Sequence, residues 1–134
     1  MKRKLAWALG LTAVAVTLVV FAPLVPLVWD YFAPSVVTVD NRSPAELRDI
    51  QVKMSGRTIW SGILMPGAAH QIWARPHGDG IVDISFSANG RPQSRPLGYV
   101  TNGIRERHEI VVGPTLEVGY TMEPIDKRSA TSGE

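Results

Sequence analysis

The chain has 134 residues, with 14 Lys plus Arg, 12 Asp plus Glu and no cysteine. The lack of cysteine excludes a disulfide framework, a thiolate metal site and a cysteine nucleophile. Setting aside Lys2, Arg3, Lys4 and Asp30 leaves eleven basic and eleven acidic residues, so the remainder is neutral. Because a nucleic-acid binder needs a basic patch to neutralise phosphates, we expect no nucleic-acid partner.

Residues 5–29 form an uncharged, apolar run directly after the three basic residues. As a helix the run would be about 37 Å long, which exceeds a hydrocarbon layer of about 30 Å. A cleaved signal peptide is the alternative, but its apolar region is shorter and ends at a small-residue cleavage site. Here Ala13 and Ala15 lie inside the run, while Ala22 and Ala33 each precede a proline. The pattern therefore favours an uncleaved transmembrane helix that acts as a signal anchor.

Flanking residues predict how this helix is oriented in the plasma (inner) membrane. Basic residues beside a span stay in the cytoplasm, so Lys2, Arg3 and Lys4 place the N-terminus inside and the rest of the chain outside. The aromatic side chains suited to the two interfaces are Trp7 at one end and Trp29 and Tyr31 at the other. Ala6 and Gly10 form a small-xxx-small pair through which two such helices could associate as a homo-oligomer.

The sequence divides into five segments, of which the fourth is a single domain. We expect a cytoplasmic basic stub at 1–4, the transmembrane helix at 5–29, a linker at 30–35, an extracytoplasmic β-domain at 36–125 and a disordered tail at 126–134. Apolar residues in the domain alternate with polar ones and are interrupted by turn residues every eight to twelve positions, which is typical of an all-β fold.

Turn residues separate about seven or eight short predicted strands. The predicted strands lie near 37–40, 48–54, 58–64, 70–74, 82–86, 97–101, 108–112 and 116–122. The clearest turn signals are Ser55-Gly56, Pro66-Gly67 and Asn89-Gly90, because the glycine of each pair accepts the positive φ that a tight turn requires. Residues 43–46 read as a helix capping box, but the alternation after Arg48 favours a strand.

These strands predict a small antiparallel β-sandwich, immunoglobulin-like in the broad sense, with a small β-barrel as the alternative. Three segments carry a resemblance to a known class: VDNRS at 39–43, IQV at 50–52 and LMPG at 64–67. They resemble the opening half of bacterial cell-surface immunoglobulin-like modules, including the CARDB type. The resemblance covers about 30 of the 134 residues and implies the fold and an extracytoplasmic location.

The chemistry-bearing residues form no catalytic motif. The chain has three histidines, and only Glu106 and His108 would share a strand face. The alternative function is a metal-handling or small-molecule enzyme domain that would use His108, Glu106 and His70. We expect ordinary structural roles instead, with no catalytic, cofactor-binding or metal-ligating residue and no cofactor. Trp60, Trp73 and the methionines are expected to fill the core. Asn41-Arg42-Ser43 is a glycosylation sequon that matters only in a glycosylating host.

Residues 91–107 combine turn residues with arginine and tyrosine, two residue types that are enriched at protein interfaces. The candidate interaction surface consists of Arg95, Tyr99, Asn102, Arg105 and Arg107. A solvated pair of loops with alternating charge is the alternative. The sequence predicts a non-enzymatic binding or scaffold module, an accessory in a membrane or envelope complex. Its expected partners are the lipid bilayer and another membrane or envelope protein.

Overall fold

The computed structural model describes residues 21–22, 24–25, 28 and 34–125. The chain divides into two compact units, Met1–Ala33 and Pro34–Glu134. In the first unit, Phe21, Leu24, Val25 and Val28 are helical, and their side chains are exposed. Within the part of the chain that the structure describes, no helix has both the length and the apolar character needed to cross a membrane.

Several predictions lie outside the described residues. They concern most of the helix at 5–29, the basic stub with Lys2, Arg3 and Lys4, the interfacial Trp7, Trp29 and Tyr31, and the tail at 126–134.

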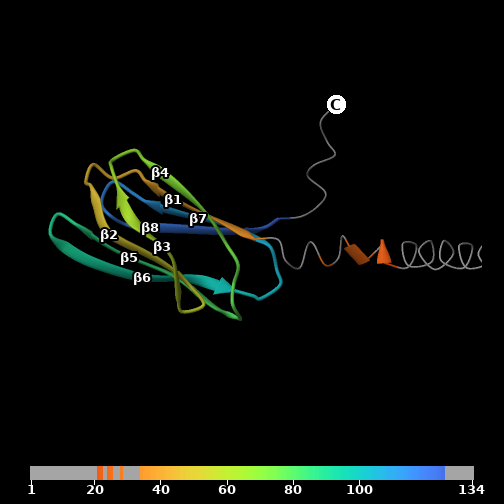
Figure 1. Ribbon diagram of the computed structural model, residues 1–134. Coiled ribbons are helices and arrows are strands. Elements are labelled where there is room, and N and C mark those ends of the chain that lie inside the picture. The colour runs from red at the N-terminus through yellow and green to blue at the C-terminus, as the bar shows by residue number, and fades with distance from the viewer. Residues whose placement is uncertain (1–20, 23, 26–27, 29–33, 126–134) are drawn as a thin grey trace, which may run out of the picture. The chain divides into compact units, whose positions relative to one another are not determined.

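The second unit is a sandwich of two four-stranded sheets (Figure 1). One sheet, called sheet A here, has the order β4-β1-β7-β8, and the other, sheet B, has the order β3-β2-β5-β6. The strands are β1 (Ser35–Asn41), β2 (Leu47–Met54), β3 (Arg57–Leu64), β4 (Ala69–Ala74), β5 (Gly80–Ala88), β6 (Arg91–Val100), β7 (Glu106–Val112) and β8 (Val118–Pro124).

The all-β prediction is confirmed, and the architecture is a two-sheet sandwich. Among the described residues, no strand pair joins one sheet to the other, as closure of a barrel would require. The expectation of purely antiparallel strands is wrong at one place, because β1 pairs with β7 in parallel. Strands that run the same way need a long crossover, and here the chain passes through sheet B between them.

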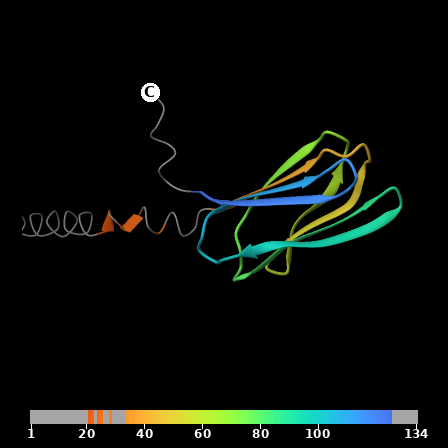
Figure 2. The same cartoon turned by 180° about the vertical axis from the view of Figure 1, so that it is seen from behind.

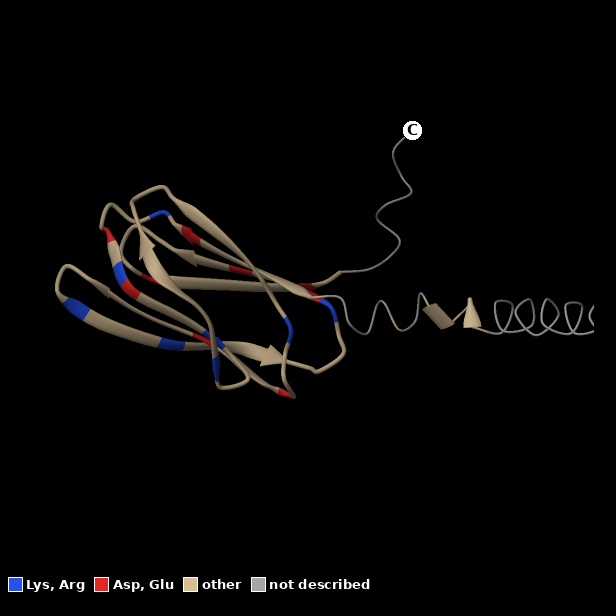
Figure 3. Cartoon of the chain, in the orientation of Figure 1, with Lys and Arg blue, Asp and Glu red and all other residues tan. Residues whose placement is uncertain are grey.

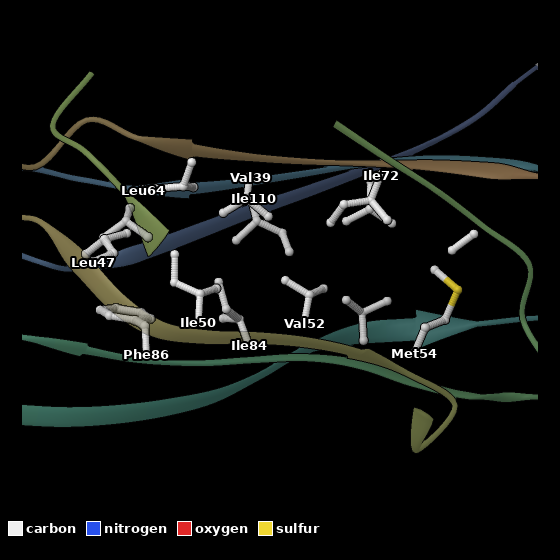
Figure 4. Packing of buried hydrophobic residues seen from close by; sticks show 14 of the residues in the cluster. Val39, Leu47, Ile50, Val52, Met54, Leu64, Ile72, Ile84, Phe86 and Ile110 are labelled. Carbon is white, nitrogen blue, oxygen red and sulfur yellow. The ribbon is translucent and has the colours of Figure 1, made fainter. Parts of the chain in front are cut away.

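Alternating apolar residues of the two sheets form one core between them. Val39, Ile72 and Ile110 of sheet A point toward Val52 and Ile84 of sheet B, and all five are buried (Figure 4). All sixteen residues of the buried cluster lie between Val37 and Val112. The β-domain therefore supplies its own core from the described residues.

The predicted tight turns are present with the expected backbone. Ser55 and Gly56 join β2 to β3 with φ values of 49° and 76°, and Asn89 and Gly90 join β5 to β6 with 52° and 74°. Positive φ at both central residues gives hairpin turns that match the twist of the strands. In the Pro66-Gly67 turn, Gly67 has φ 75° and the Ala68 N–H donates to the Met65 carbonyl at 3.0 Å.

Several strand boundaries differ by one or two residues from the sequence analysis, and the start of β6 differs most. β6 begins at Arg91, six residues before the predicted start, because it is an edge strand and an edge tolerates Pro92 and Pro96. β8 begins at Val118, since Leu116 belongs to the turn before it, with φ 67°.

Several side chains expected in the core lie at the surface. Trp73 is 61% exposed because it points to the outer face of edge strand β4, and Trp60 is only partly buried. Met65 is exposed in a turn and Met122 on edge strand β8, so Met54 alone of these three methionines fills the core.

The sandwich has two ends, which are named here by the loops that form them. The entry end is where β1 begins, and it carries the loops 55–56, 75–79 and 101–105. The far end carries the loops 42–46, 65–68, 89–90 and 113–117. The two ends are opposite each other along the strands in both views of the molecule (Figures 1 and 2).

Candidate functional site

The predicted interaction residues occupy the entry end, with one exception. Tyr99 is the last exposed residue of β6. Asn102 and Arg105 lie in loop 101–105, and Arg107 follows on β7. Arg95 lies midway along β6, opposite Ile84 of β5, and is separate from the other four. The loop-pair interpretation of residues 91–107 is wrong for 91–100, which form a strand.

Hydrogen bonds tie the entry-end loops to one another. Asp79 accepts a hydrogen bond from the Asn102 backbone N–H at 2.8 Å. Desolvation raises the pKa of Tyr99, and the nearby Asp79 carboxylate adds to that shift. Arg105 donates from Nε to the Pro34 carbonyl at 3.3 Å. The start of the domain and two loops are thus held together at one end.

Basic and acidic positions are interspersed over both sheets, and neither charge covers a whole sheet (Figure 3). The described domain therefore offers no continuous basic stripe of the kind that tracks nucleic-acid phosphates.

A buried cluster of ionisable side chains lies between the sheets near the entry end. His108 is fully buried, and its Nδ1 lies 2.8 Å from the Tyr120 hydroxyl. Its Nε2 lies 3.5 Å from Oε2 of Glu106, which is 7% exposed, and neither of these two atoms has a hydrogen-bond partner. The sequence foresaw that Glu106 and His108 share a face but not that the face is buried.

Burial favours the neutral form of each group in this cluster. Desolvation raises the pKa of Glu106 and lowers the pKa of His108. It also raises the pKa of Tyr120, and the Glu106 carboxyl adds to that shift. His108 and Glu106 lie in a closed interior where charging either side chain is costly, so the cluster is part of the packed core.

Glycine makes room for this cluster on the opposite sheet. A Cβ on Gly98 of β6 would overlap the Tyr120 ring. The Tyr120 ring therefore crosses from edge strand β8 onto the backbone of edge strand β6, which closes that side of the sandwich.

The structure does not bring His70 to Glu106 and His108. His70 lies opposite Val39 on β4, whereas His108 lies opposite Val37 on β7, with β1 between them. The His70 ring instead stacks on Trp60, with centroids 4.5 Å apart. In residues 34–125 and the few described residues before them, no three His, Asp or Glu side chains gather as a metal ion would require.

An open hollow of about 470 Å³ lies at the far end, between β2 and the β5–β6 turn. Its lining residues carry charges and polar groups, namely Glu46, Arg48, Asp49, Ser87, Asn89 and Gly90. Arg48 donates from Nη2 to Glu46 Oε2 at 2.8 Å. Asp49 has φ 51° where the register of β2 shifts against both neighbouring strands. The bulge therefore holds a strained backbone beside the hollow.

No protein family model matches the sequence, and no curated protein matches it. Four chains of solved structure do match. One is the NMR structure of a protein from Eubacterium rectale, which is 13% identical with a TM-score of 0.50. The match covers 72% of this chain and 97% of that chain. At this identity the likeness shows the fold alone.

Sequence reasoning missed the hollow because its two sides come from distant segments. The Asn89-Gly90 signal fixed one side, the hairpin turn. The other side depends on the bulge at Asp49, and nothing in the alternation of residues 47–54 marks a positive φ there.

Proposed function

We propose that the chain is a single-pass membrane protein whose β-domain is a non-enzymatic binding or scaffold module outside the plasma membrane. The uncharged run at 5–29 supports the anchor, and so do the exposed apolar side chains of Phe21, Leu24, Val25 and Val28. The basic stub supports a cytoplasmic N-terminus. The two-sheet sandwich is compatible with an immunoglobulin-like module, a fold that presents loops on a rigid frame.

The far-end hollow is the main support for a binding role. A concave surface with both charges, built from a bulge and a tight hairpin turn, suits recognition of a polar segment of a protein partner. The strained Asp49 backbone belongs to the same place, and strain of this kind gathers at binding sites.

The frame behind the hollow is held by one buried side chain. The Asn41 Nδ2 donates to the Ala45 carbonyl at 2.9 Å and to the Leu64 carbonyl at 3.1 Å. Its Oδ1 accepts from the Ser43 N–H and hydroxyl. These bonds fasten the segment that leads into Glu46, so a partner would meet a surface that is already ordered.

Photocrosslinking in the native membrane tests this proposal. A photoreactive residue replaces Asn89 at the hollow, and a control residue replaces Thr121, which is exposed on edge strand β8. The proposal predicts a discrete membrane or envelope protein crosslinked from position 89 and absent from position 121. Recovery of only lipid or abundant bystanders, or the same adducts from both positions, would overturn it.

A matched pair of substitutions sharpens the result. Arg48→Ala removes one charge from the hollow, and Arg95→Ala removes one exposed charge from β6 outside it. We expect the crosslink from position 89 to fall with Arg48→Ala and to persist with Arg95→Ala. Equal loss in both variants would point to net charge and not to the hollow.

A further inference from the structure

Large apolar side chains are exposed mainly at the entry end. Seven such side chains of the β-domain are exposed, and four lie in or within two residues of entry-end loops: Trp73, Ile81, Tyr99 and Ile104. Trp73 is on sheet A, Ile81 and Tyr99 are a cross-strand pair on sheet B, and Ile104 is in the loop between the sheets. Together they surround the end of the sandwich.

Arginine side chains accompany them. Arg57, Arg75, Arg105 and Arg107 lie at this end, and so do the carboxylates of Asp79, Glu106 and Glu123. Glu106 is buried, and Asp79 accepts from Asn102. Arg57, Arg105 and Arg107 form no ion pair with any described residue, whereas Arg42 pairs with Asp40 at 2.7 Å and Arg48 with Glu46 at 2.8 Å. Glu123 lies opposite Arg107 on β8, and Asp79 is the other exposed carboxylate, so these three arginines leave an excess of positive charge at the entry end.

The domain follows the uncharged run closely in the sequence. Only residues 30–33 stand between Trp29, the last residue of the run, and Pro34, the first residue of the second compact unit. A tether this short keeps the loops at a high effective concentration near whatever holds the run.

We infer that the entry end rests on the headgroups of an anionic lipid bilayer. The inference relies on the proposed anchor and adds a partner for a second surface of the domain. Trp73 and Tyr99 have an apolar ring with a polar atom, which suits the interface between lipid and water. Arg57, Arg105 and Arg107 match phosphate and carboxylate headgroups in charge.

This placement gives four of the predicted interaction residues a partner. Tyr99, Asn102, Arg105 and Arg107 face lipid headgroups, and the far-end hollow is directed away from the bilayer toward a protein partner. The domain then stands on its end loops, with its strands running away from the membrane.

The absence of cysteine allows a direct test with single labels on the full-length chain in lipid nanodiscs. Ile104→Cys and Met65→Cys are matched, because each replaces an exposed apolar loop residue, one at each end. Each carries the same fluorophore, and headgroup-labelled lipid serves as quencher. The bilayers are phosphatidylcholine with and without phosphatidylserine. Circular dichroism confirms that each labelled protein is folded.

We expect strong quenching at position 104 and little at position 65 in bilayers that contain phosphatidylserine. High ionic strength should weaken the quenching at position 104, because it screens the arginines from the headgroups. Arg57→Gln and Arg107→Gln should each weaken binding of the entry end to the bilayer by about fivefold. Equal quenching at both positions would overturn the inference. Quenching at position 104 that is the same with and without phosphatidylserine would overturn it as well.

Failure of the anchor would be visible separately. If an alkaline wash removes the full chain from native membranes, the proposed function fails, because the chain is not integral. If the chain resists the wash and position 104 is still not quenched, the anchor stands and only the lipid contact is wrong.

Discussion

The Tyr120 ring and Gly98 show how a single missing Cβ shapes the sandwich. The sequence predicted strands at 97–101 and 116–122, but nothing in it showed that residue 98 must be glycine. The requirement arises from a contact between strands that are distant in sequence, since β6 and β8 belong to different sheets. Local pattern carries no information about such a contact.

Gly98→Ala should therefore destabilise the domain by about 1–3 kcal/mol, because the new methyl group displaces Tyr120 from its place over β6. Chemical denaturation measures this change. Gly119→Ala is the matched control, since a Cβ there would meet its nearest neighbour, the Val111 carbonyl oxygen, at 3.8 Å. Equal losses in the two variants would contradict the packing described for Tyr120.

Glu106 offers a second test at the residue scale, through the dependence of stability on pH. Burial raises its pKa above the ordinary 4.5, so the folded state holds a proton that the unfolded state has lost. The stability that this provides is complete below pH 4.5 and disappears as pH rises through the folded pKa. Glu106→Gln removes the loss at high pH and should be more stable than the parent at neutral pH.

The advantage of Glu106→Gln should shrink as pH falls and vanish below 4.5. His108 has the opposite dependence, because its lowered pKa gives stability that is present above 6.5 and lost as pH falls. This contribution is present in both proteins. Denaturant unfolding across pH measures the difference. A variant less stable than the parent at neutral pH would show instead that Glu106 and His108 form a charged pair.

At the scale of elements, the sequence predicted the tight turns well, but it did not predict which strands lie at the edges of the sheets. Ser55-Gly56, Pro66-Gly67 and Asn89-Gly90 fixed three connections because their backbone angles are local properties. The extent of β6 was missed because proline usually marks a strand as broken, and only the sheet order reveals that β6 is an edge. The parallel pairing of β1 with β7 was also missed, because it too depends on the order of strands in the sheet.

Asn41 connects the end of β1 to the segment that precedes β2, where the sequence pattern resembles a helix start. Ser43 Oγ donates to Asn41 Oδ1 at 2.7 Å and accepts from the Ala45 N–H at 3.3 Å, which is the bond of a capping hydroxyl. The chain makes only this one turn, because it enters β2 at Leu47. Burial of the Asn41 amide also removes it from solvent, so the sequon it begins is closed to modification in the folded domain.

Asn41→Ala should destabilise the domain by about 3 kcal/mol, since it leaves the buried Leu64 carbonyl and the partly buried Ala45 carbonyl without this donor. Asn102→Ala should change stability by less than about 0.5 kcal/mol, because that residue is exposed and its contact with Asp79 is made by its backbone N–H. Thermal and denaturant unfolding compare the two. A small effect of Asn41→Ala would mean that the far-end frame is held by other contacts.

At the scale of the whole molecule, the chain combines an uncharged run with a β-domain that supplies its own core. The sequence predicted both parts from simple patterns, hydropathy for the run and alternation for the domain. It could not predict the hollow, the buried Glu106–His108 pair or the gathering of apolar and basic residues at the entry end. Each of these depends on which loops meet at which end of the sandwich.

The central claim is that the β-domain lies outside the membrane and the N-terminus inside. Cysteine labelling with a membrane-impermeant maleimide tests it most directly, because the native chain has no cysteine. Met65→Cys marks the far end of the domain, and Lys4→Cys marks the basic stub while Lys2 and Arg3 keep its charge. We expect position 65 to react in intact spheroplasts and position 4 to react only after the membrane is permeabilised. Reaction of position 65 only after permeabilisation, or of position 4 before it, would contradict the account.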